Sequence, residues 1–326
     1  MPPERHPVES QILRPIFHCG AVVPPEYFIG RETELRDSQR LIDNGHSFLL
    51  VGRHRDGKTS LLKMLIHQML GDPDNRILPV YLNVQMWPNL SIETFLEHTI
   101  IGLLGDISRH VFKYNFKFMT AASDDLEEAP ARLRDDDYFR SFLKIYRHVR
   151  KRTYSRNDES PDAFRTDEFL EIHHVLMELL RTKGWVGCAV FYDEANRLSK
   201  EIRVEQLVSH EEALAVPGRT SVYAASPAMA DTFVQLKTSF VQEVELNPFG
   251  SDEIWRLLAC YYFGEESRVD EVPVAKDAVD RLLDFSQGRP YLVQLLAQES
   301  FELANRMGDA EVTDKHIIVA NERLKE

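Results

Sequence analysis

The feature that most constrains this chain is the stretch at residues 47–70, SFLLVGRHRDGKTSLLKMLIHQML. It opens on an apolar run typical of a buried strand, and it continues through a loop that fits G-x-x-x-x-G-K-[ST]. Apolar residues at helical spacing then follow. Strand, glycine loop and helix therefore come in the order that a phosphate-binding loop requires.

Each residue type in this loop suits a triphosphate ligand. Gly52 and Gly57 allow backbone angles that a side chain would forbid, so that backbone N–H groups and a helix N-terminus can face phosphate oxygens. Lys58 supplies a cation for the β and γ phosphates, and the Thr59 hydroxyl is a ligand for Mg²⁺. The alternative is an ordinary glycine turn before a helix. The predicted nucleotide-binding loop comprises Gly52, Arg53, His54, Arg55, Asp56, Gly57, Lys58, Thr59 and Ser60.

Bulk composition excludes several other classes of protein. The formal net charge of -13 argues against a non-specific nucleic-acid coat. Cys19, Cys188 and Cys260 lack the paired spacing of a disulfide framework or a zinc site, which indicates a reducing compartment. No apolar run is long enough to span a bilayer, and the N-terminal residues lack an export signal. We therefore expect a cytoplasmic protein with no membrane partner.

The remaining patterns predict an α/β core followed by a helical tail. Further strands are expected at residues 78–84, 185–192, 221–225 and 240–246, and from residue 251 onward only helical patterns occur. A charged segment near 110–165 interrupts the core pattern and is predicted to be an insert. We therefore predict an extended proline-rich arm at 1–25, a core at 26–249 and a small all-helical domain at 250–326.

A second chemical signal stands where the apolar strand AVFY ends in Asp193 and Glu194. In open parallel α/β sheets, ligands bind at the carboxyl ends of the strands. Asp193 is suited to hold Mg²⁺, and Glu194 is suited to orient and polarise the water that attacks the γ phosphate. The alternative is an acidic pair that only caps the next helix. Together with Lys58 and Thr59, the pair favours hydrolysis over phosphoryl transfer to a small substrate.

These motifs carry a resemblance to a known family. FIGRETEL, GRHRDGKTSLL, VFYDEANRL, AASP, ELNPFG and GRPYLVQLL occur in the order seen in AAA+ ATPases, and the sequence most resembles the STAND and initiator-like branch. The resemblance implies a five-stranded parallel sheet of order 5-1-4-3-2, flanked by helices and followed by a helical lid. It covers the chain from about residue 27 to the end, except for the charged insert.

The resemblance also implies roles for particular residues. Phe28, Ile29 and Arg31 would lie beside the adenine, although a hydrophobic staple and an exposed charge explain them equally well. Ser226 would be the sensor-1 residue, or else part of a Ser-Pro turn. Arg289, followed by Pro290, would offer a cation from the lid, or else be a solvated arginine at a helix start. Arg219 is expected to be a solvent-exposed turn residue rather than an arginine finger.

The function that these inferences imply is Mg²⁺-dependent ATP binding and hydrolysis, with Lys58, Glu194, Ser226 and Arg289 in catalytic roles. Nucleotide state would control a protein partner or homo-oligomer. Departures from the family are the absence of an arginine after the fourth strand and of repeats after the lid. One alternative is an ATP-gated nucleic-acid-binding assembly factor, like initiators or transposition regulators, that uses the basic run between Lys144 and Arg156. Another is a scaffold that binds nucleotide without turnover, which the intact acid pair disfavours.

Overall fold

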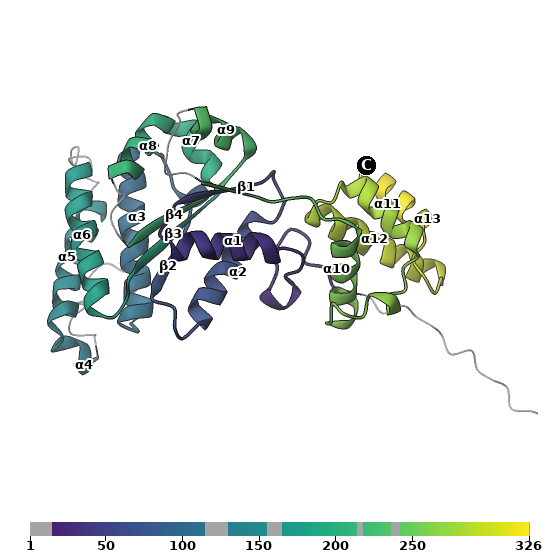
Figure 1. The fold of residues 1–326 in the computed structure, drawn as a ribbon, viewed down its shortest axis with the longest axis horizontal. Helices are drawn as coiled ribbons and strands as arrows, with labels where there is room; N and C mark the ends of the chain where they lie inside the picture. Colours follow the sequence, from purple (N-terminus) through teal and green to yellow (C-terminus); the bar gives the residue numbers. More distant parts are fainter. Residues whose placement is uncertain (1–14, 115–129, 155–164, 214–217, 236–241, 326) are drawn as a thin grey trace, which may run out of the picture. The chain divides into compact units, whose positions relative to one another are not determined.

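Five parallel strands form the central sheet of the protein (Figure 1). The computed structural model describes residues 15–114, 130–154, 165–213, 218–235 and 242–325. The strands lie in the order β2-β3-β4-β1-β5, which confirms the predicted topology. They comprise β1 (Phe48–Val51), β2 (Ile77–Asn83), β3 (Gly187–Asp193), β4 (Arg219–Ala225) and β5 (Gln242–Glu245).

Helices connect these strands and make up the tail of the chain. Between β1 and β3 the structure has α2 (Lys58–Gly71), α3 (Ile92–Asp106), α4 (Ala131–Arg134), α5 (Asp137–Tyr154) and α6 (Thr166–Thr182), with α1 (Glu32–Asp43) before β1. After β3 come α7 (Leu198–Glu201), α8 (Val204–Ala213) and α9 (Pro227–Gln235). The tail holds α10 (Ser251–Phe263), α11 (Lys276–Ser286), α12 (Pro290–Met307) and α13 (Asp314–Arg323).

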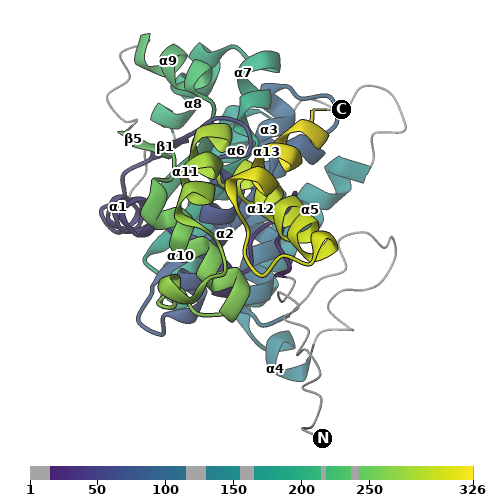
Figure 2. The ribbon, with the colours of Figure 1, turned by 90° about the vertical axis from the view of Figure 1, so that its right-hand side faces the viewer.

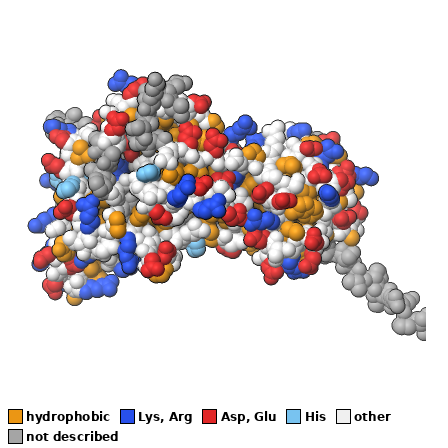
Figure 3. All heavy atoms as spheres, viewed as in Figure 1, with side chains coloured by type: hydrophobic (Ala, Val, Ile, Leu, Met, Phe, Trp, Pro, Cys, Tyr) orange, Lys and Arg blue, Asp and Glu red, His pale blue; other side chains and the backbone are white. Residues whose placement is uncertain are grey.

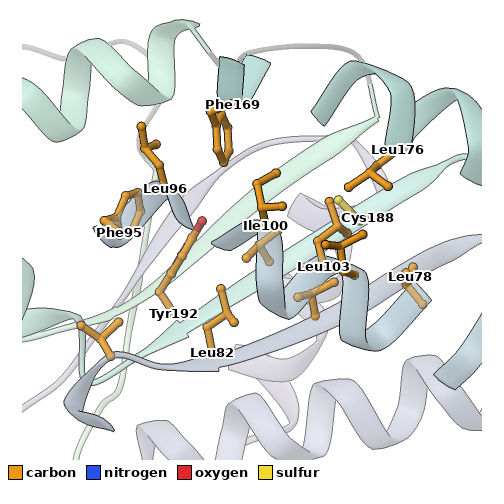
Figure 4. Close-up of a cluster of buried hydrophobic side chains, with 14 of the residues drawn as sticks. Leu78, Leu82, Phe95, Leu96, Ile100, Leu103, Phe169, Leu176, Cys188 and Tyr192 are labelled. Carbon is orange, nitrogen blue, oxygen red and sulfur yellow. The ribbon is translucent and has the colours of Figure 1, made fainter. Parts of the chain in front are cut away.

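One hydrophobic core lies between the sheet and the helices α3 and α6. Figure 4 shows side chains of these two helices lying over β2 and β3. All seven residues of β3 are buried, as expected for a strand that is covered on both faces of a parallel sheet. Capping fixes where α3 begins, because the Ser91 hydroxyl accepts a hydrogen bond from the Thr94 N–H while the Thr94 hydroxyl accepts one from the Ser91 N–H.

The described part of the predicted insert belongs to this same core. Helix α5 buries Phe139, Phe142 and Tyr146 at helical spacing, and these residues join the cluster formed by the sheet, α3 and α6. Lys183, at the C-terminus of α6, holds the start of α5 by an ion pair with Asp136. The charged segment is therefore inserted in sequence, but its helix α5 is packed as part of the core.

The C-terminal helices form a second hydrophobic cluster of their own, and α11, α12 and α13 make up the helical lid (Figure 2). Phe17, from the N-terminal arm, is buried in this cluster, with its ring 4.8 Å from that of Tyr261. Tyr27 stacks on the same Tyr261 ring at 4.9 Å. The described end of the arm is thus part of the lid's core.

The chain divides into two compact units. The lid unit contains residues up to 35, residues 52–64 and the residues from 246 onward, whereas the sheet unit contains residues 36–51 and 65–245. The glycine loop therefore groups with the C-terminal helices. The predicted domain limits at residues 25 and 249 remain predictions. Among the residues that the model describes, no helix has the length and apolar character needed to cross a membrane.

Candidate functional site

The glycine loop joins β1 to α2 and has a left-handed glycine directly before the helix. Gly57 has φ +95°, in the region that favours glycine, and Lys58 is the first residue of α2. At Gly52 an added Cβ would lie 3.3 Å from the Leu246 Cβ, so this position has little room for a side chain. Arg55 adopts φ +70° although it is not glycine, a conformation that side chains rarely tolerate.

Internal hydrogen bonds fix the shape of this loop. The Lys58 Nζ donates to the carbonyl oxygens of Gly52 and Arg53, both at 2.8 Å, and the residue is only 8% exposed. The Asp56 Oδ2 accepts a hydrogen bond of 2.7 Å from the Arg53 N–H. The ammonium is therefore held against the loop that it is expected to serve, beside the N-terminus of α2, where a phosphate is electrostatically favoured.

Arg31 connects the loop to the segment that follows β5. Its Nη1 donates to Glu34 Oε1 (2.9 Å) and to the Asn247 carbonyl oxygen (2.5 Å), and its Nη2 donates to the Asp56 carbonyl oxygen (3.3 Å). The guanidinium also lies 4.7 Å from the centre of the Phe249 ring. Arg31 is 5% exposed and has protein partners on both terminal nitrogens. Its predicted place beside the adenine, like that of the half-buried Phe28 and Ile29, remains a prediction.

Arg289 stands at the N-cap of α12, and one nitrogen of its side chain is buried. Its Nε makes no hydrogen bond within the described residues, and Pro290 begins the helix directly after it. A buried, unsatisfied guanidinium N–H is costly unless a ligand completes it, and an anion is the natural ligand. Tyr291, two residues after Arg289, places the centre of its ring 4.1 Å from the Arg55 guanidinium of the glycine loop.

The acid pair ends β3 in a tightly bonded turn of the sheet unit. Asp193 is 2% exposed, and its Oδ2 accepts a hydrogen bond of 2.7 Å from the Tyr81 hydroxyl. Its Oδ1 accepts one of 3.0 Å from the Glu194 N–H. Burial and the hydrogen bond to Asp193 raise the pKa of Tyr81 well above its ordinary value, so its hydroxyl stays a donor at neutral pH. Glu194 is left-handed, with φ +55° and ψ +36°.

Ser226 leaves the same edge of the sheet as the acid pair. The parallel strands β3 and β4 are neighbours, so Asp193, which ends β3, and Ser226, which follows β4, stand at the carboxyl ends of adjacent strands. The Ser226 N–H donates to the Asn196 Oδ1 at 2.5 Å. Its hydroxyl accepts a hydrogen bond from the Met229 N–H at the start of α9, and still has a proton to donate.

The oxygen donors of the predicted metal site suit Mg²⁺. A threonine hydroxyl and a carboxylate are hard oxygen ligands of the kind that this ion prefers. Thr59, in the first turn of α2, is half-buried. Both residue types therefore fit the ion, and the assignment of Thr59 and Asp193 as its ligands remains a prediction.

Arg219 differs from its expected position. It is not a solvent-exposed turn residue but the first residue of β4, and its side chain is only 1% exposed. Glu211 of α8 provides the buried countercharge. This contact explains how a charged residue can stand in a strand that is buried along its whole length.

Sequence reasoning missed three residues that contact the predicted site. Tyr81 lies inside an apolar strand, and nothing in the sequence around it indicated a polar role. Only the register between β2 and β3 shows that it lies near Asp193. Asn196 follows the acid pair closely enough to have been considered. Tyr291 follows Arg289 and Pro290, and nothing in the sequence indicated that it would meet Arg55.

Comparison with solved structures finds similar folds at low sequence identity. The first is the Orc1 protein of Aeropyrum pernix in complex with DNA, with a TM-score of 0.51, 15% identity, and coverage of 91% of this chain and 66% of that chain. A Walker-type ATPase of Pyrococcus abyssi has a TM-score of 0.51 and 17% sequence identity, with coverage of 91% of this chain and 72% of that chain. The structure of Drosophila ORC bound to DNA has a TM-score of 0.51 and 11% sequence identity, with coverage of 98% of this chain and 65% of that chain.

The chain thus spans slightly less than two thirds of the Aeropyrum and Drosophila chains. No protein-family model matches the sequence, and no curated protein matches it. Agreement in fold with this little identity concerns architecture alone. In architecture, the chain is similar to AAA+ ATPases, including initiator-like ones, and it has their fold: a five-stranded parallel sheet followed by a helical lid.

Proposed function

We propose that this chain binds ATP with Mg²⁺, hydrolyses it slowly and works as a nucleotide-driven switch of the STAND or initiator-like kind. The observation that carries the proposal is the glycine loop, in which Gly57 is left-handed and the buried Lys58 ammonium lies beside the start of α2. Such a loop binds a triphosphate through backbone N–H groups and one cation.

The acid pair supports hydrolysis rather than binding alone. When bound, Mg²⁺ would neutralise charge on the phosphates, with Asp193 and Thr59 as its protein ligands. Glu194 would accept the proton of the attacking water. Ser226 and Arg289 would respond to the γ phosphate, so that ATP and ADP favour different conformations of the chain and different states of a partner or of a homo-oligomer.

Two substitutions separate binding from hydrolysis. Lys58→Ala removes the cation that the motif specifies for the β and γ phosphates and should abolish ATP binding, measured by calorimetry. Glu194→Gln should keep ATP affinity and lower turnover by orders of magnitude, measured by phosphate release. Lys315→Ala on α13 and Glu205→Gln on α8 are exposed controls of the same chemistry. Unchanged nucleotide affinity in Lys58→Ala would refute the proposal.

A second candidate function, nucleic-acid binding gated by ATP, is favoured by the surface of α5. Arg140, Lys144, Arg147 and Lys151 are all exposed and follow one another at helical spacing, opposite the buried face of the helix. Side chains of Arg150 and Arg152, and Arg156 itself, lie outside what the structure describes. Two of the similar folds come from proteins solved with DNA.

The acidic side chains near these basic residues make nucleic-acid binding the weaker of the two candidate functions. Arg140 pairs with Asp137 at 2.5 Å, and on the face shown in Figure 3 acidic and basic side chains are interspersed. The test is the double variant Lys144→Glu, Lys151→Glu, with Lys200→Glu, Lys315→Glu as the matched control. Loss of two phosphate contacts should lower the slope of log affinity against log salt by about 2. Absence of ATP-dependent DNA or RNA binding by the wild type at low salt would remove this candidate.

A further inference from the structure

A buried ion pair in the sheet unit has no role in the proposed function so far. The side chains of Arg219 and Glu211 are 1% and 4% exposed, and the Arg219 Nη2 lies 3.4 Å from the Glu211 Oε1. The Nε and Nη1 of Arg219 are buried, and no atom of the described residues is a hydrogen-bond partner for either of them. A buried pair this incompletely bonded is poor evidence for stabilisation, because apolar residues of similar volume often fill such a site at no cost in stability.

The pair holds the hydroxyl groups of two stacked tyrosines. The Arg219 Nη2 donates to the Tyr192 hydroxyl at 2.9 Å, and the Tyr223 hydroxyl donates to the Glu211 Oε1 at 2.5 Å. The two rings are register partners on β3 and β4, with centroids 4.7 Å apart and an interplanar angle of 10°. Thr99 of α3 adds a contact of 3.2 Å with the Tyr192 hydroxyl. Four elements therefore converge on one polar cluster: β3, β4, α3 and α8.

One member of this cluster, Tyr192, lies directly before the acid pair in the chain. Tyr192 precedes Asp193, and the residue after that, Glu194, is in the left-handed region. A left-handed glutamate persists only where the surrounding structure fixes it, and such strain is concentrated at functional sites. On β3, Tyr192 stands directly before Asp193, so the contacts of its hydroxyl with Arg219 and Thr99 hold the strand one residue before the acid pair.

We propose that Arg219 and Glu211 are positioning residues for hydrolysis. They fix Tyr192, and through it the end of β3, so that Asp193 and Glu194 keep the geometry that water attack requires. Through Glu211 they also make the orientation of the acid pair depend on the position of α8. This inference rests on the proposed ATPase function.

The decisive experiment compares single and double substitutions. Arg219→Met and Glu211→Leu each leave a buried charge without its partner, and each should lower Tm markedly. The double variant has no unpaired charge and should recover most of the wild-type Tm. A positioning role predicts that its kcat for ATP hydrolysis nevertheless falls by about 10- to 100-fold. Its affinity for ATP should stay within about twofold, because the glycine loop is untouched.

Tyr192→Phe gives an independent test in case the double variant does not fold. It removes only the hydroxyl that Arg219 contacts, and it should lower kcat several-fold while ATP affinity is kept; Tyr138→Phe on the exposed face of α5 is the control. Wild-type kcat in a folded double variant, or in Tyr192→Phe, would overturn the inference and leave the proposed function intact. Absence of hydrolysis by the wild-type chain would overturn both.

Discussion

Replacing Tyr81 by Phe tests how the predicted metal ligand is oriented. The Tyr81 hydroxyl donates a 2.7 Å hydrogen bond to Oδ2 of Asp193, a carboxylate that is 2% exposed. Hydrogen bonds to charged groups contribute about 1.5–3 kcal/mol, and loss of the partner that orients a metal ligand weakens metal binding roughly 10- to 100-fold. Phe fills nearly the same volume, so the change removes this bond and little else.

We expect Tyr81→Phe to raise the Mg²⁺ concentration needed for half-maximal ATP hydrolysis by about 10- to 100-fold. Mn²⁺ binding in the presence of ATP, followed by electron paramagnetic resonance, should weaken to a similar extent. Nucleotide affinity in the absence of divalent ions should be unchanged, and the exposed Tyr138→Phe variant serves as control. The Tyr81 hydroxyl also draws negative charge away from the Asp193 carboxylate, and by this effect alone its removal would strengthen metal binding. Equal or tighter metal binding in Tyr81→Phe would therefore refute the idea that its role is orientation.

Two further predictions concern stability. Gly288→Ala should lower the free energy of unfolding by about 1–2 kcal/mol because its backbone is left-handed. Overpacking should cost about 1–3 kcal/mol more, since the added Cβ would lie 2.3 Å from the Phe249 carbonyl oxygen. The control is Gly264→Ala, whose backbone is also left-handed but whose added Cβ would meet open space, so thermal unfolding should show only the first cost. Burial raises the pKa of Asp136, but hydrogen bonds from Lys183 and from backbone N–H groups outweigh it, and the net pKa is lowered from 3.8. The ionised Asp136 therefore stabilises the folded state fully at neutral pH, and this contribution is lost as the pH falls through the lowered pKa. Asp136→Asn should cost about 1 kcal/mol at pH 7, a difference that disappears in strong acid in urea titrations; a cost that persists there would contradict the assignment.

The strands could be predicted because a parallel sheet covered on both faces demands continuous apolar runs. The expected strand at 48–51 matches β1, and the other expected strands differ from the observed ones by a few residues at their ends. The order of the sheet came from the family resemblance, since nothing in the spacing of the strands fixes which of them pair. The glycine loop was readable because its motif specifies backbone conformation directly.

The rest depends on contacts between residues far apart in the sequence. Arg219 follows Pro217 and Gly218, so it read as an exposed turn residue; only the fold reveals that Glu211 supplies its countercharge. The helical spacing of Phe139 and Phe142 was visible, but not that this face packs against α3 and α6. The left-handed backbone of Glu194 has no sequence signature, because it is imposed by the turn in which the residue lies.

The close approach at Gly288 places a tight backbone contact directly before Arg289. The Phe249 N–H donates to the Gly288 carbonyl oxygen at 2.8 Å, and no side chain fits at Gly288 between the two backbones. Arg289, the N-cap of α12, is the residue directly after this backbone contact. An anion bound by that guanidinium would therefore lie close in the chain to a backbone contact, Phe249 to Gly288, that leaves no room for a side chain.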